Sequence, residues 1–239
     1  MAKITHPWQR IFVALDTTDI GHAVALADNL KGSVGGVKIG KEFFTANGPE
    51  GVHRITECGM PLFLDLKYHD IPNTVASAIR ASLALKPFMV NVHAGGGRRM
   101  MMAASKAANE AAPNQRPIVL GVTVLTSMDR EDLAEVGIND EPIEHVLRLA
   151  KLAKASGLGG VVCSAKEVSA LRRAVGPDFK LVVPGIRPAW ASADDQRRVV
   201  TPKNAIDLGA DYLVIGRPIT RHKDPIAAAR LIAEELSEP

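Results

Sequence analysis

Short apolar segments alternate with helical patterns along the whole chain, and this alternation limits the possible fold more than any other feature. The segments have the length and the Val, Ile and Leu content of strands that are buried on both faces, as the strands of a parallel sheet are. Helical patterns follow them, for example near 20–31, 71–85, 129–136, 142–155 and 164–175. Eight strands are predicted, at 11–15, 34–39, 61–67, 88–92, 118–125, 160–163, 180–183 and 212–215.

This arrangement predicts an α/β fold with a single (β/α)8 TIM-type barrel over residues 1–239, and a doubly wound open sheet is its competitor. The open sheet is disfavoured because no GxGxxG pattern follows the first strand. No linker, low-complexity tract or block of charge divides the chain, so we expect one domain.

The overall composition indicates an ordinary globular chain. Hydrophobic residues make up 46% and charged residues 23%, and the net charge of +3 is too small and too evenly spread to indicate a nucleic-acid partner. A modest basic excess is compatible with a phosphorylated metabolite. Cys58 and Cys163 lack CxxC spacing, which favours reduced thiols. Because we find no signal peptide and no apolar run of transmembrane length, we expect a cytoplasmic protein with no membrane partner.

Charged residues interrupt the third predicted strand near its carboxyl end. Asp65 and Lys67 are two residues apart, so a strand would point both side chains to the same face, and Asp70 follows just beyond. Pro72 suits the first turn of the next helix. Charges buried together are costly unless they pair, so a structural network and a catalytic cluster are both open interpretations.

Other predicted strands carry polar residues at the same end. Active sites of (β/α)8 barrels lie at the carboxyl ends of the strands, and a phosphate is often held by the loops after strands seven and eight. The first of these loops contains Gly185 and Arg187. The second contains Gly216 and Arg217, where a helix start and a guanidinium would suit a phosphate. At or just beyond the other strand ends stand Asp16, Lys38, His93 and Thr126.

The segment Asp65-Leu-Lys-Tyr-His-Asp-Ile-Pro-Asn-Thr74 resembles the signature of the orotidine 5′-phosphate decarboxylase family, in its bacterial form. Segments 37–40 (VKIG), 124–127 (VLTS), 183–188 (VPGIRP), 195–198 (DQRR) and 214–218 (VIGRP) are similar to that family as well. The DxKxxD pattern alone is shared with sister decarboxylases, but the combination is specific. The resemblance implies conversion of orotidine 5′-monophosphate to UMP and CO2, the last step of de novo pyrimidine synthesis.

The resemblance also implies roles for the charged residues. Lys67 would donate the proton that replaces the lost carboxylate at C6 of the pyrimidine, and Asp65 would lie close to the departing group. Lys38 and Asp16 would hold ribose hydroxyls and complete an alternating charge network of Lys38, Asp65, Lys67 and Asp70.

The remaining implied roles concern the partner subunit, the base and the phosphate. The enzyme would be a homodimer in which Asp70 and Thr74 enter the site of the second subunit. The long polar segment 187–198 would form a lid. Base and phosphate would be bound by Thr126 (which we favour over Ser127), Gln196, Arg187, the Gly216 region and Arg217.

The chemistry can be stated without the resemblance. Loss of CO2 from C6 leaves an electron pair in an sp² orbital that cannot delocalise into the ring carbonyls. No residue pattern indicates a cofactor that serves as an electron sink, or a convincing metal cluster, so we expect neither. An ammonium beside C6, kept charged by flanking carboxylates, can stabilise the developing charge and then supply the proton.

Two other functions stay open. A sister enzyme that shares DxKxxD would be a magnesium-dependent sugar-phosphate decarboxylase or a hexulose-phosphate synthase. Those relatives are expected to have an acidic residue where Lys38 stands, which speaks against them. A barrel that only binds a nucleotide or a partner protein is the second alternative, although binding alone does not require a buried proton donor.

Overall fold

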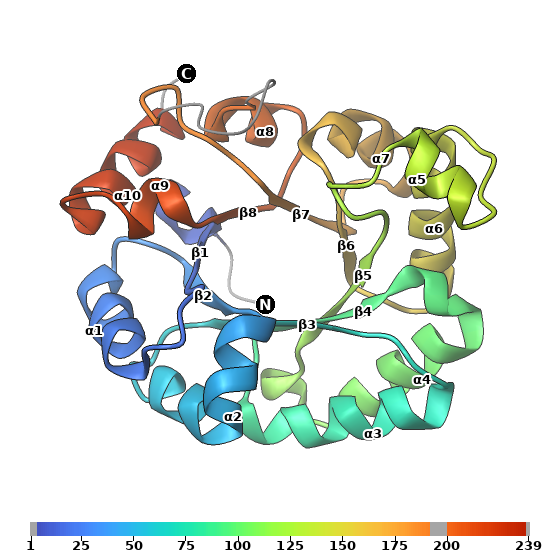
Figure 1. The fold of residues 1–239 in the computed structure, drawn as a ribbon, viewed down its shortest axis with the longest axis horizontal. Helices are drawn as coiled ribbons and strands as arrows, with labels where there is room; N and C mark the ends of the chain where they lie inside the picture. Colours follow the sequence, from blue (N-terminus) through green and yellow to red (C-terminus); the bar gives the residue numbers. More distant parts are fainter. Residues whose placement is uncertain (1–3, 192–199, 238–239) are drawn as a thin grey trace.

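The strands close into a parallel barrel in which each strand pairs with its two neighbours in chain order (Figure 1). The computed structural model describes residues 4–191 and 200–237. Pairing of the last strand with the first completes the ring, so the predicted (β/α)8 barrel is confirmed and the open sheet is wrong. The strands are β1 (Ile11–Ala14), β2 (Gly36–Ile39), β3 (Leu62–Tyr68), β4 (Met89–His93), β5 (Ile118–Val122), β6 (Gly160–Val162), β7 (Lys180–Pro184) and β8 (Tyr212–Ile215).

Helices surround the barrel (Figure 1). Asp19 caps the first of them by accepting the N–H of His22 at 2.9 Å. Pro72 stands in the first turn of the third, as the sequence predicts. Within residues 4–191 and 200–237, no helix combines the length and apolarity needed to span a membrane. The α-helices are α1 (Ile20–Leu30), α2 (Lys41–Thr56), α3 (Pro72–Ser82), α4 (Gly97–Ala108), α5 (Arg130–Glu135), α6 (Pro142–Ala155), α7 (Val168–Val175), α8 (Pro202–Asp207), α9 (Arg217–Thr220) and α10 (Pro225–Glu235).

Most strands are apolar on both faces because the two faces pack against different partners. In β1, Phe12 and Ala14 belong to the cluster that fills the barrel interior, whereas Ile11 and Val13 belong to the larger cluster between the strands and the helices. Successive residues of a strand point to opposite faces, so most strands contribute to both clusters. β2 is the exception, because Gly36 and Lys38 alternate with Val37 and Ile39, and only the latter two belong to a cluster, the larger one. This double burial is the physical reason for the continuous apolar runs in the sequence.

Several boundaries differ from the predicted ones. β2 begins at Gly36, because residue 34 makes only an isolated bridge, and β5 ends at Val122 although an apolar run continues to residue 125. α2 is kinked at Gly48, which has a φ of +60° and is followed by Pro49, a residue without a backbone N–H. The helix predicted over 71–85 ends at Ser82 and continues as a 3-10 turn, Leu83–Leu85.

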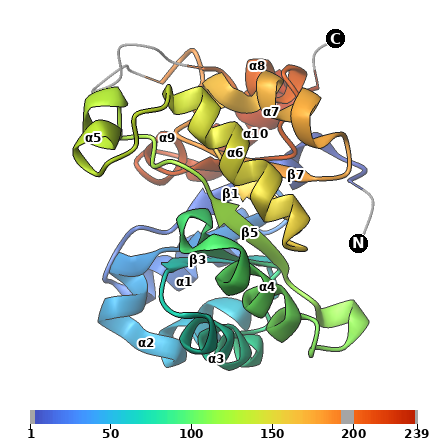
Figure 2. The same ribbon diagram turned by 90° about the vertical axis from the view of Figure 1, so that its right-hand side faces the viewer.

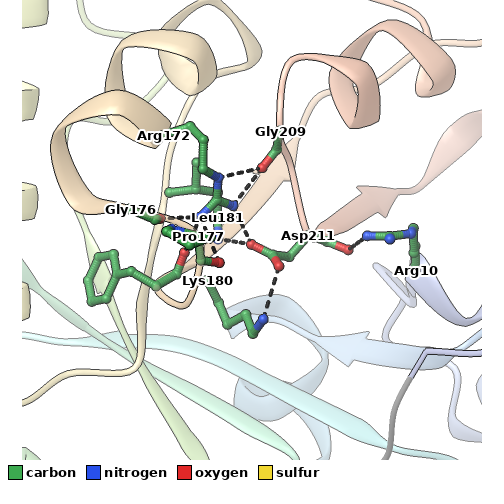
Figure 3. Close-up of polar contacts among 9 residues, drawn as sticks. Arg10, Arg172, Gly176, Pro177, Lys180, Leu181, Gly209 and Asp211 are labelled. Carbon is green, nitrogen blue, oxygen red and sulfur yellow. Dashed lines mark hydrogen bonds and ion pairs between the residues drawn. The ribbon is translucent and has the colours of Figure 1, made fainter.

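Asp211 links three segments at the amino end of the barrel (Figure 3). Its Oδ2 accepts Arg172 Nη2 at 2.6 Å and the backbone N–H of Leu181 at 2.9 Å, and its Oδ1 accepts Lys180 Nζ at 3.1 Å. Arg172, on α7, also donates to the carbonyl of Gly209. The side chains of Asp211 and Arg172 are only 14% and 21% exposed. Because this network lies opposite the carboxyl ends of the strands, we assign it to stability.

Candidate active site

Four side chains at the carboxyl ends of β1, β2 and β3 form a row of alternating charge. Lys38 Nζ lies 3.2 Å from Asp16 Oδ1 and 3.3 Å from Asp65 Oδ2. Lys67 Nζ lies 2.6 Å from the other oxygen of Asp65. Lys38 and Asp65 are each only 8% exposed, so the pairing offsets much of the cost of their desolvation. The row brings together four of the predicted site residues.

The backbone at Lys67 departs from regular strand geometry. Its φ is +53°, in the left-handed region that residues with a Cβ rarely adopt. Leu64 pairs with Val90 and Tyr68 with Val92, so residues 65–67 of β3 stand opposite the single residue 91 of β4. The prediction of a regular strand through Lys67 is therefore wrong, because a bulge interrupts it. The predicted meeting of the Asp65 and Lys67 side chains is nevertheless confirmed.

Asn91 fills this gap in the ladder and is a residue that the sequence analysis missed. Its Oδ1 accepts the backbone N–H of Lys67 at 2.8 Å, and its Nδ2 donates to Asp65 Oδ1 at 2.6 Å. The available signal was a single polar residue inside the apolar run of β4. A buried amide needs partners, so its presence there indicated a polar contact across the sheet.

The absence of a side chain at Gly40 leaves space for the Lys38 ammonium. A Cβ at Gly40 would lie 2.9 Å from Lys38 Nζ and 3.5 Å from Asp16 Oδ1. In the sequence this glycine stands out only as part of a motif, because spacing does not reveal a close approach between two residues.

A cavity of about 210 Å³ opens beside the charged row. Lys38, Asp65 and Lys67 form a polar part of its wall, and Thr126 lines it as well. Of the two residues considered for contact with the base, geometry thus favours Thr126 over Ser127. The other lining residues are mainly apolar: Phe63, Val122, Val124, Leu125, Val162, Cys163, Pro184 and Val214.

The two cysteines are separate free thiols. Cys163 lines the cavity but is 1% exposed, and this burial raises the pKa of its thiol well above the ordinary value. Burial likewise raises the pKa of Cys58 to about 11. Both therefore remain protonated at neutral pH, where a thiol is a poor nucleophile.

Arginine side chains surround a second cavity, of about 370 Å³, at the loops that follow β7 and β8. Arg187 and Arg217 line it, as the phosphate prediction requires, together with Arg221, Trp190 and His222. Seen from the side, α5 and α9 both lie toward this end of the barrel (Figure 2). The rest of the predicted lid, including Gln196, lies outside the described residues.

Gly216, also assigned to the phosphate, immediately precedes α9 as its N-cap residue. A Cβ built on Gly216 would come no closer than 3.5 Å to another heavy atom, the Cβ of Ala14. Its position beside Arg217 matches the predicted loop-to-helix junction.

Asp70 and Thr74 lie apart from the charged row of their own chain. Asp70 is exposed, and its Oδ1 accepts the backbone N–H of Ile71 at 2.6 Å. Thr74 is exposed on α3. Their predicted function depends on a second copy of the chain and stays a prediction.

His93 ends β4 next to the row. Its ring lies 5.3 Å from that of His69, measured between centroids. Burial, and then the neighbouring His69 and the Lys41 and Lys67 ammonium groups, lower the pKa of His93, so its imidazole is neutral at neutral pH. A neutral ring adds no positive charge beside Lys67.

A further cavity, of about 300 Å³, lies at the opposite, amino end of the barrel. Trp8, Phe12, Phe88 and Tyr212 give it aromatic walls, with Lys31 at its edge. No member of the charged row lines it, so we assign the chemistry to the smaller cavity at the carboxyl ends of the strands.

Residues 9–232 match the model of the orotidine 5′-phosphate decarboxylase / HUMPS family. A protein of Rhodospirillum rubrum named orotidine 5′-phosphate decarboxylase is 53% identical over 99% of this chain and 96% of its own length. A protein of Chromobacterium violaceum with the same name is 55% identical over 95% of this chain and 91% of its own length.

The fold gives the same assignment. The crystal structure of orotidine 5′-phosphate decarboxylase from Lactobacillus acidophilus superposes with a TM-score of 0.85 at 38% identity, covering 95% of this chain and 99% of that one. The match to the family model and to these relatives extends over nearly all of the barrel. The chain belongs to the orotidine 5′-phosphate decarboxylase / HUMPS family.

Proposed function

We propose that this chain converts orotidine 5′-monophosphate to UMP and CO2, and thus acts as a carboxy-lyase of pyrimidine nucleotide synthesis. The observation that carries the proposal is the row of Asp16, Lys38, Asp65 and Lys67 in the wall of a largely apolar cavity. Relatives that are more than half identical to it bear the name of this decarboxylase, which supports the same reaction.

Lys67 is the proposed proton donor. When the bond between C6 and the carboxylate breaks, CO2 leaves and the electron pair remains on C6. The Lys67 ammonium beside C6 stabilises this negative charge and then transfers one proton to it, which leaves a neutral amine and UMP. Asp65, whose Oδ1 lies 2.6 Å from Nζ, holds the ammonium in place.

The apolar walls of the cavity increase the effect of these charges. Val122, Val124 and Val162 exclude water from one side of the row, and electrostatic interactions are stronger where the effective dielectric constant is low. The charges are already in place before substrate arrives, so little reorganisation is needed during the reaction. The reaction proceeds on this account without a cofactor or a metal.

The other site residues bind the substrate in this proposal. The phosphate contributes binding energy at a distance from C6, and this energy can be used to order the site around the reacting group. Asp16 and Lys38 hold ribose hydroxyls, and Thr126 contacts the base. Gln196, outside the described residues, bridges base and phosphate, and the phosphate is bound by Arg187, the Gly216 region and Arg217.

We infer that the active form is a homodimer in which Asp70 and Thr74 of each subunit serve the site of the other. Both residues are exposed in the single chain. Large apolar side chains are exposed nearby in the sequence and on the neighbouring helix: Ile71, the N-cap residue of α3, is 65% exposed, and Met102 on α4 is 52% exposed. Apolar surface of this kind is typical of interfaces when it forms a patch. α3 and α4 lie side by side (Figures 1 and 2).

Complementation tests the shared site. Lys67→Ala and Asp70→Ala chains, each inactive alone, are mixed under conditions that exchange subunits. Recovered turnover is expected, because some heterodimers then contain one intact site. No turnover in verified heterodimers, purified through a different affinity tag on each chain, would contradict the arrangement.

A magnesium-dependent sister reaction on a sugar phosphate is the alternative. The position of Lys38 opposes it, because the ammonium lies between the carboxylates of Asp16 and Asp65. A divalent ion held by these two groups would have to displace that ammonium. In the proposed reaction, the Lys38 ammonium therefore supplies the positive charge that a magnesium ion would supply in the sister enzymes.

The test is the loss of orotidine 5′-monophosphate absorbance on addition of purified protein in excess EDTA, with UMP identified as the product. Turnover in EDTA is expected. Inactivity in EDTA followed by activity on a hexulose phosphate with magnesium would replace the proposal by the sister reaction.

A further inference from the structure

Asn91 is a polar residue built into the interior of the barrel wall. It lies in the middle of β4, has no exposed surface, and is flanked by Val90 and Val92, which are equally buried. Burying an amide in such surroundings is unfavourable unless its donor and its acceptor both find partners. The two partners that it does find, Asp65 and Lys67, both belong to the proposed catalytic row.

The first contact replaces a missing ladder bond. Between the pairs Leu64–Val90 and Tyr68–Val92, the bulge places three residues of β3 opposite Asn91 alone. The backbone N–H of Lys67 would lack its regular partner there, and Asn91 Oδ1 accepts it at 2.8 Å. The side chain of one strand thus holds the left-handed backbone of Lys67, at φ +53°, on the other.

The second contact fixes the carboxylate. Asp65 Oδ1 accepts both Asn91 Nδ2 and Lys67 Nζ, each at 2.6 Å, while its other oxygen faces Lys38. With one oxygen held by a neutral amide, the carboxylate plane cannot rotate freely between the two lysines. The amide satisfies both contacts only in one orientation, because its oxygen accepts and its nitrogen donates.

We propose that Asn91 is a positioning residue for the decarboxylation, which directs the Lys67 ammonium and the Asp65 carboxylate at the reacting C6. This inference rests on the proposed function. Asn91 acts on the backbone of the proton donor and on the side chain of its counter-ion, and it does not line the cavity itself. It therefore affects the chemical step more than substrate binding.

Two variants of Asn91 separate an effect on the chemical step from an effect on substrate binding. In Asn91→Ala both contacts are lost, and kcat is expected to fall about 100-fold, the effect of an error of about 1 Å in the placement of a reacting group. In Asn91→Ser a hydroxyl can replace one contact, so a smaller loss of about 10-fold is expected. The KM for orotidine 5′-monophosphate and the Kd for UMP should stay within about threefold of the wild-type values in both variants.

The matched control is Ser82→Ala. Ser82 is also buried, at 3% exposure, and donates one hydrogen bond to the carbonyl of Ile79, but it lies on α3 outside the row. Its kcat should equal that of the wild type. Urea unfolding of all variants shows the folded fraction at the assay temperature, and rates are compared per folded molecule.

A crystal structure of Asn91→Ala adds a readout that does not depend on activity. Lys67 is expected to leave the left-handed region, or the distance from its Nζ to Asp65 to increase. Unchanged kcat in folded Asn91→Ala, an increase of KM alone, or failure of both variants to fold would each overturn the positioning role. An inactive wild-type chain would instead overturn the proposed function.

Discussion

Replacing Glu167 by Gln is predicted to stabilise the chain at alkaline pH and to change it little at acid pH. Glu167 ends a 3-10 turn before α7, and its carboxylate accepts the backbone N–H of Ser164 at 2.8 Å. Burial raises the pKa of this carboxyl from 4.5 to about 7, against the opposing effects of the Ser164 hydrogen bond and of Lys166. Glutamine has the same shape, can keep the acceptor, and carries no charge to desolvate.

The magnitude follows from linkage. Since the folded chain binds this proton more tightly than the unfolded chain, the stability that the proton contributes is complete below pH 4.5 and is lost as the pH rises through about 7. At about 1.4 kcal/mol per pKa unit, the loss approaches 3 kcal/mol at about pH 8.5 and is near 1 kcal/mol at about pH 5. Glu167 is only partly buried, so screening by water makes these values upper limits.

Urea unfolding followed by circular dichroism measures the effect. Glu167→Gln should raise the free energy of unfolding by about 2 kcal/mol more at about pH 8.5 than at about pH 5. Glu234→Gln, at an exposed position on α10, is the control and should show no such difference. Equal gains at both pH values, or a loss at the higher one, would refute the reasoning.

Three further predictions concern stability, the charged row and the phosphate. Asp211→Asn should lower the free energy of unfolding by about 3 kcal/mol, since it leaves partly buried cations without their counter-ion, and an unchanged urea midpoint would contradict the stability assignment. Gly40→Ala should lower kcat/KM at least about 10-fold, because the added Cβ would displace the Lys38 ammonium. Gly95→Ala, whose Cβ would meet open space, should leave kcat/KM unchanged, and equal activities of the two variants would contradict the close approach of Gly40 to Lys38. Arg217→Ala should weaken UMP binding by about 10- to 100-fold and uridine binding far less, as calorimetry can measure, and equal losses for both ligands would disprove the phosphate contact.

The barrel could be predicted from the sequence because its physical basis is local and repeated. Segments such as 181–183 and 212–215 are short and wholly apolar, which double burial explains, and the structure places them in β7 and β8. The placement of polar residues at strand ends likewise predicted that Lys38 and Asp65 would lie at the same end of the barrel, because parallel strands in a barrel bring their carboxyl ends together. The resemblance implied that the two residues belong to one charge network, and the structure places them 3.3 Å apart.

The details of the site depended on contacts that spacing does not encode. Period-two alternation predicted that Asp65 and Lys67 would share a face, but the bulge that places Lys67 at φ +53° arises from the pairing with β4. Asn91 was hidden in an apolar run, since its importance comes from a residue 24 positions away. The roles of Asp70 and Thr74 in a second subunit came from the resemblance alone, because their proposed partners belong to another chain.

The most direct test of the central claim compares turnover and binding in Lys67→Ala. The account assigns to this ammonium, held 2.6 Å from Asp65, both the stabilisation of charge at C6 and the proton that replaces CO2. Its removal should abolish conversion of orotidine 5′-monophosphate, while calorimetry still detects UMP binding; Lys151→Ala, an exposed position on α6, should behave as the wild type. Substantial residual kcat in Lys67→Ala would contradict the assignment of the proton donor and the mechanism built on it.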